Sequence, residues 1–88
     1  MDFDSMSDKE LWDLATTEDE RVQLDSLYTL SHRLYHRNAY SEVMSPALAG
    51  LDLAGKLDDA TLAINLGFYL GRSLIELKRF DEALPRLE

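Results

Sequence analysis

The chain has 88 residues, of which 45% are hydrophobic and 30% are charged, and its formal net charge is −8 at pH 7. This length suits one domain or part of one, and the hydrophobic content is too high for an intrinsically disordered segment. The absence of cysteine excludes disulfides, thiolate metal sites and cysteine nucleophiles. The acidic balance argues against nucleic acid as a partner, because phosphate binding requires clustered lysine and arginine.

The sequence also carries no membrane signal. No apolar run approaches the roughly 18 residues that a transmembrane helix needs. The N-terminus is acidic and has no basic segment of the kind that begins a signal peptide. We therefore expect a cytoplasmic protein with no membrane partner. The charge is uneven, with nine acidic and two basic side chains in residues 1–25 but two arginines and no acid in residues 26–40.

Helical patterns follow one another along the chain, and no segment has the pattern of a strand. Two Ser/Thr-x-x-Glu capping boxes mark helix starts, and they are Ser7 with Glu10 and Thr17 with Glu20. The first box predicts a short helix that ends near residue 16. The second box predicts a long helix over residues 18–37, whose apolar stripe consists of Leu24, Leu27, Leu30 and Leu34.

Two more helices are predicted after a short turn. Residues 41–55 form the next helix, with Pro46 near its start, where proline is tolerated, and with Gly55 as its C-cap. Asp58 is the expected N-cap of a helix that runs over residues 59–77.

The last segment predicts a helical hairpin. Four leucines at three- and four-residue steps place one apolar face on its first helix, and they are Leu66, Leu70, Leu74 and Leu77. A turn at residues 78–80 then separates this helix from a final helix that begins near Asp81. Gly67 and Gly71 lie four residues apart. Because a glycine costs about 1 kcal/mol in a helix interior, the pair indicates close approach of a neighbouring helix.

The chain overlays on itself when it is shifted by 40 residues. Apolar positions then match apolar positions, small residues match small residues, and an aromatic residue marks the turn in both units. The matched pairs include Leu30 with Leu70, Ser31 with Gly71, Leu34 with Leu74, Tyr40 with Phe80 and Val43 with Ala83. A fixed period of this length indicates a stacked helical array.

The second unit resembles a tetratricopeptide repeat, whose first helix follows a W-x2-L-G-x2-Y pattern. The matching positions are Gly67, Leu70, Gly71 and Leu74 for that pattern, Phe80 for the turn aromatic, Ala83 for the small residue of the second helix and Leu87 for its later aromatic. The resemblance extends over residues 24–88. The spacing of 40 residues exceeds the usual value of about 34, as in some bacterial repeat proteins, and the closing proline is missing. The alternative is a non-repeat helical bundle with a chance similarity.

This resemblance implies an all-α fold of antiparallel helical hairpins, stacked as a right-handed superhelix behind a short N-terminal capping helix. Residues 1–17 would form the tail and the capping helix, residues 18–57 the first hairpin, and residues 58–88 a second, incomplete hairpin. Because a stacked array needs about three units to bury a continuous core, we expect an N-terminal part of a longer protein. A second copy would cover the apolar face of the last helix, which predicts a homodimer or a swapped assembly.

The first helix of each tetratricopeptide hairpin lines a groove that binds peptides or protein segments. On this chain the resemblance implies seven binding residues, which are Tyr28, His32, Tyr35, His36, Asn65, Phe68 and Arg72. Arg33 and Arg37 beside the tyrosines and histidines would suit an acidic or aromatic peptide. Asn65 and Arg72 would suit a carboxylate. The alternative is that all of these are ordinary residues of an amphipathic helix surface, and Trp12 is expected to pack on the first groove helix.

No metal, cofactor or catalytic site is expected. His32 and His36 have the i, i+4 spacing of a zinc-binding pair, but no glutamate follows the first histidine, and the nearby arginines would repel a cation. No nucleophile elbow or phosphate-binding glycine loop is present, so we do not expect an enzyme. The leading function is peptide or protein-segment binding within a larger protein. The alternatives are a homodimerisation or assembly domain, and a regulatory or sensory module fused to a downstream signalling domain.

Overall fold

The computed structural model describes the backbone of residues 3–83 and most of the side chains among them. A short 3-10 helix, η1 (Phe3–Ser5), precedes four α-helices, which are α1 (Asp8–Leu14), α2 (Glu20–His36), α3 (Tyr40–Lys56) and α4 (Ala60–Ala83). No strand occurs between residues 3 and 83, so the all-α class is confirmed for this part of the chain. None of the described helices is long and apolar enough to cross a bilayer.

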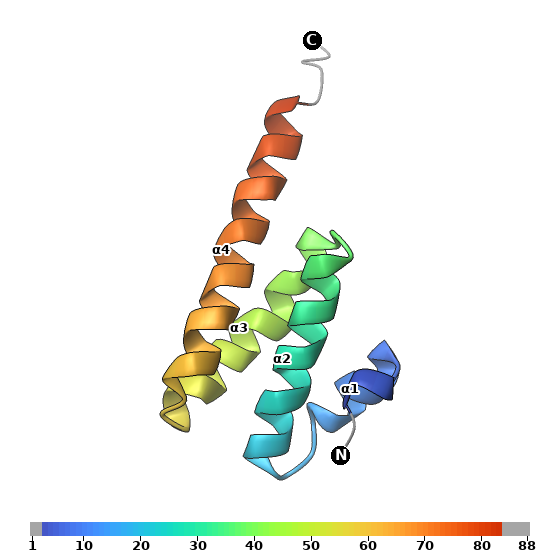
Figure 1. The fold of residues 1–88 in the computed structure, drawn as a ribbon, viewed down its shortest axis with the longest axis vertical. Coiled ribbons are helices and arrows are strands. Elements are labelled where there is room, and N and C mark those ends of the chain that lie inside the picture. The colour runs from blue at the N-terminus through green and yellow to red at the C-terminus, as the bar shows by residue number, and fades with distance from the viewer. Residues whose placement is uncertain (1–2, 84–88) are drawn as a thin grey trace.

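Helices α2, α3 and α4 run antiparallel to one another in sequence order (Figure 1). α3 packs against both α2 and α4, α4 also contacts α2, and α1 lies against α2. α4 has 24 residues, whereas α2 and α3 have 17 each. The C-terminal turns of α4 therefore project beyond the α2–α3 hairpin, as Figure 1 shows in orange and red.

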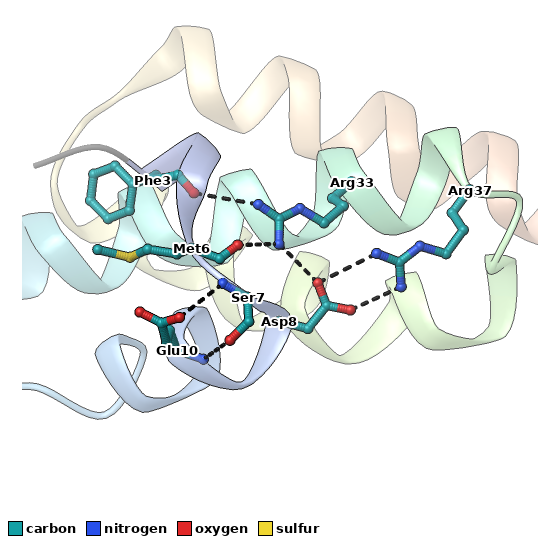
Figure 2. Close-up of polar contacts among 7 residues, drawn as sticks. All are labelled: Phe3, Met6, Ser7, Asp8, Glu10, Arg33 and Arg37. Carbon is teal, nitrogen blue, oxygen red and sulfur yellow. Dashed lines mark hydrogen bonds and ion pairs between the residues drawn. The ribbon is translucent and has the colours of Figure 1, made fainter.

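Local side chains fix where the first two helices begin. Ser7 and Glu10 form the predicted capping box of α1, in which each side chain accepts the other residue's amide N–H, at 3.2 and 3.3 Å (Figure 2). The predicted second box is wrong, because Asp19 rather than Thr17 is the N-cap of α2. The Asp19 carboxylate accepts two amide N–H groups of the first turn, and an anion at this position is also favoured by the helix dipole.

The turns on either side of α3 share one backbone geometry. Asn38 and Asp58 both adopt left-handed φ values, 64° and 57°, which asparagine and aspartate tolerate better than most residues. The next amide N–H, from Ala39 or from Asp59, bonds to a carbonyl five residues earlier at 2.9 and 2.8 Å, as in a Schellman motif. Gly55, the expected C-cap, lies inside α3 instead. Asp59 rather than Asp58 caps α4, because its carboxylate accepts an amide N–H of the first turn at 3.0 Å.

The leucine stripe of α2 lies at the centre of the core. All four predicted members are buried, and they are Leu24, Leu27, Leu30 and Leu34. The other helices supply the buried residues Leu11, Val43, Ala47, Ala54, Leu66 and Tyr69. Pro46 is also buried, but it lies in the second turn of α3 rather than in the first. The core is thus formed by α2, α3 and the N-terminal half of α4, with Leu11 contributed by α1.

The close approach between helices occurs at Gly50 and not at the predicted glycine pair. A Cβ atom at Gly50 would lie 2.8 Å from Leu66 Cδ1 and 3.6 Å from Leu27 Cβ, so three helices meet around this residue. A Cβ atom at Gly67 or Gly71 would meet no atom within 4 Å. The expectation for this pair was wrong because both glycines lie on the side of α4 that faces away from α2 and α3.

α4 continues without interruption through the predicted turn at residues 78–80 and through Asp81, so both the turn and the new helix start were wrong. The segment from Lys78 to Ala83 contains neither glycine nor proline, and most of its residues favour helix. Without a break in the sequence, a turn forms only where tertiary packing stabilises it. The expectation for Leu87 concerns a residue outside the described range.

Candidate binding surface

Seven rings from three helices form one cluster, which we call the aromatic surface. Its members are Tyr28, His32, Tyr35 and His36 on α2, Tyr40 at the start of α3, and Phe68 and Tyr69 on α4. The ring centroids of Tyr35 lie 5.0 Å from Tyr69 and 6.0 Å from Phe68. These distances are typical of interacting aromatic pairs. The structure therefore brings the predicted ring residues of α2 together with Phe68, more than 30 positions away in the sequence.

Tyr69 lies at the base of the aromatic surface, and it was not among the predicted binding residues. Its side chain is 8% exposed, and its hydroxyl lies 2.6 Å from Nδ1 of His32. Burial raises the pKa of Tyr69 to about 12, and the hydrogen bond with Tyr28 is the second cause. The hydroxyl therefore stays protonated at neutral pH. It forms a hydrogen bond with Nδ1 of His32, whose direction depends on the imidazole tautomer. The leucine periodicity of α4 could have indicated that Tyr69 is buried. Tyr69 lies three residues after the buried Leu66 and therefore on the same side of the helix.

His32 and His36 stand at the rim of the aromatic surface. Both side chains are exposed, and their ring centroids are 4.3 Å apart in an edge-to-face arrangement. Among the side chains that the structure describes, no group of three potential metal-ligating residues is present around them or elsewhere. Their geometry suits stacking and hydrogen bonding with a ligand.

On α4 the candidate residues Asn65, Phe68 and Arg72 share one side of the helix. Phe68 is 56% exposed and Asn65 is partly buried. Arg72 already forms an ion pair with Glu76, with 3.3 Å between Nη2 and Oε1. A ligand carboxylate at Asn65 and Arg72 would have to compete with Glu76 for the guanidinium group.

Arg33 and Arg37 do not belong to this surface, contrary to expectation. Arg33 donates to the Met6 carbonyl at 2.6 Å and to the Asp8 carboxylate at 3.0 Å, while Arg37 donates to the same carboxylate at 2.9 Å (Figure 2). We call this group the arginine clamp. Successive residues of a helix are rotated by about 100°, so the arginines after His32 and His36 point towards α1. The two arginines that favoured an acidic ligand therefore do not contribute positive charge to the aromatic surface.

The arginine clamp also changes the ionisation of Asp8. The pKa of Asp8 is lowered from its ordinary value of 3.8, most strongly by the hydrogen bond from Arg37, with a smaller contribution from Arg33. Arg33 donates to the Phe3 carbonyl as well, at 3.4 Å. The clamp thus attaches η1 and the start of α1 to one side of α2.

A pocket of about 390 Å³ opens between α1, α2 and α3 on another side of the molecule. Trp12 lines it together with Leu27 and Leu53, so this side chain borders α3 as well as the first groove helix. Trp12 as a whole is 40% exposed. At the rim, Lys56 is paired with Glu20. No sequence motif had indicated this pocket.

No protein-family model, curated protein or solved structure matches this chain. The fold class accordingly rests on the coordinates, and any function has to be argued from the side chains described above.

Proposed function

We propose that this chain is a non-enzymatic, tetratricopeptide-like module that binds a peptide or protein segment on the aromatic surface, as part of a larger cytoplasmic protein. The arrangement of helices supports the repeat-like part of this proposal. α4 contacts both helices of the α2–α3 hairpin, which is the position that the first helix of a following hairpin would take.

The observation that carries the proposal is the gathering of partly exposed rings from two helices. Phe68 is 56% exposed, and His32 and His36 are exposed beside the buried ring of Tyr69. Aromatic side chains provide a large contact area with few rotatable bonds, and a favourable ring pair contributes about 0.5–1.5 kcal/mol. A surface of this kind suits an extended segment that inserts an aromatic or proline side chain between the rings.

The charge of the aromatic surface further restricts the kind of ligand that can bind. Arg33 and Arg37 are engaged in the arginine clamp, and Arg72 is paired with Glu76. A highly acidic segment would find little compensation here. We therefore propose a ligand that is recognised mainly by its aromatic or proline side chains, with the imidazoles supplying hydrogen bonds.

A displayed library of random peptides, selected on the 88-residue chain, would test this proposal. Enriched peptides should contain an aromatic residue or proline, and His36→Ala and Phe68→Ala should each weaken their binding by about 10-fold, as expected for a ring contact of this kind. Fluorescence polarisation with a labelled enriched peptide measures the change.

Leu48→Ala is the matched control, because Leu48 is 53% exposed on α3 and contributes no ring to the aromatic surface. Its affinity should equal that of the unmodified chain. Peptides that bind the His36 and Phe68 variants as tightly as the unmodified chain would overturn the proposal, as would a selection that enriches no peptide.

A further inference from the structure

The side of α4 opposite the core carries an apolar stripe, of which only Phe68 also belongs to the aromatic surface. Ile64 is 70% exposed, Phe68 56% and Ile75 46%. Steps of four, seven and eleven residues place these three side chains in one line along a helix. Gly67 and Gly71 lie next to this line, where a Cβ atom added to either would meet open space.

We propose that two copies of this chain associate through the outer face of α4, with the two α4 helices antiparallel and Ile64 lying against Ile75 of the second copy. This inference does not depend on the proposed peptide binding. The two surfaces adjoin at Phe68, whereas Ile64 and Ile75 belong only to the interface between copies.

The spacing of large and small residues makes this face complementary to itself. In the antiparallel register that pairs Ile64 with Ile75, Phe68 falls opposite Gly71 of the second copy. Two-fold symmetry repeats both contacts, so that each phenylalanine lies over a glycine where space is open. A parallel arrangement would instead place phenylalanine against phenylalanine and glycine against glycine. The two phenylalanine rings would then be crowded, and empty space would remain between the glycines.

The helix dipoles favour the same orientation. An antiparallel pair opposes the two α4 dipoles, whereas a parallel pair would place like ends of the dipoles together. A second copy therefore matches this face in shape, and the dipoles favour the antiparallel orientation.

Light scattering of the 88-residue chain over a range of concentrations tests the association. The mass should rise from 10.1 kDa towards twice that value as the concentration increases. The double variant Ile64→Glu with Ile75→Glu should remain monomeric over the same range, with an unchanged circular dichroism spectrum. Leu48→Glu is the matched control, because it places the same charge on a similarly exposed leucine of α3, and it should associate like the unmodified chain.

A chain that stays monomeric at every concentration would overturn the proposal. Association that the double variant leaves intact, or that Leu48→Glu reduces equally, would overturn it as well. Peptide binding by His36→Ala is a separate measurement, so failure of the interface and failure of the binding surface can be told apart.

The chain contains no cysteine, so introduced thiols can report the register. A mixture of the single variants Ile64→Cys and Ile75→Cys should form a disulfide-linked heterodimer under mild oxidation. Either variant alone should link poorly, because two copies of the same position would lie roughly 16 Å apart along the helix axis, and a disulfide needs Cα atoms within about 7 Å. Efficient linking of each variant alone, or no excess linking in the mixture, would overturn the antiparallel register.

Discussion

Two sides of α2 differ in how their side chains are used. On one side, Arg33 and Arg37 are held by the Asp8 carboxylate and by backbone carbonyls of the N-terminal segment. On the other side, His32 and His36 remain exposed around the buried ring of Tyr69. The comparison teaches that the first side is a structural contact whose polar groups already have partners, whereas the second retains exposed ring surface that a ligand could cover.

The largest expected effect comes from removing the base of the aromatic surface. Tyr69→Ala should lower the free energy of unfolding by about 3 kcal/mol, because a large buried ring is replaced by a cavity. Tyr69→Phe should cost only about 1 kcal/mol, since it removes the hydroxyl that forms a hydrogen bond with His32 but keeps the ring. Urea unfolding followed by circular dichroism measures both changes. Equal effects of the two variants would show that the hydroxyl, rather than the ring, accounts for most of the contribution of Tyr69 to stability.

The next largest effect should distinguish the two arginines of the clamp by their contributions to stability. Arg33→Ala should lower the free energy of unfolding by about 1.5 kcal/mol, because the partly buried guanidinium bonds to two carbonyls and a carboxylate. Arg37→Ala should have a clearly smaller effect, because Arg37 is exposed and water can replace its contacts. Fluorescence of Trp12, the single tryptophan, reports whether α1 leaves α2. A larger change for Arg37→Ala would contradict this order.

The smallest effect concerns the carboxylate that both arginines share. Asp8→Asn should cost about 0.5–1 kcal/mol at neutral pH, because the pair is partly exposed and screened by water. The pKa of Asp8 is lowered below 3.8 in the folded state, so its contribution is complete above that ordinary value. It should disappear as the pH falls through the lowered pKa.

Urea unfolding of the unmodified chain and of Asp8→Asn between pH 2 and about 7 checks this dependence. The difference between the two should be constant above about pH 5 and should shrink towards zero at the acid end. A difference that persists unchanged at the lowest pH would mean that the effect of Asp8 is not electrostatic.

Much of the secondary structure could be predicted because its signals are local. The Ser7–Glu10 capping box and the leucine stripe of α2 each depend on residues within a few positions of one another, and both are present as expected. The helix starts were less certain where two candidates lay close together. Thr17 and Asp19 could both have capped α2, and the choice depended on which side chain reaches the free amides.

The candidate surface was only partly predictable. Helical periodicity brought the tyrosines and histidines of α2 to one side, but it could not reveal that Tyr69 lies beneath them or that the neighbouring arginines pair with Asp8. Both facts depend on contacts between residues at least 25 positions apart. The glycines illustrate the same limit, because Gly50 and Gly67 are both helical and only packing shows which one contacts another helix.

The sequence by itself determined that the chain is helical, where most of its helices lie and which residues share a helix side, because turns, caps and periodicity are short-range effects. The tertiary structure decided which of those sides became core, clamp or exposed surface, since that depends on how α1, α3 and α4 pack around α2. It also decided that α4 continues past residues 78–80, because a turn without glycine or proline forms only when a packing partner stabilises it.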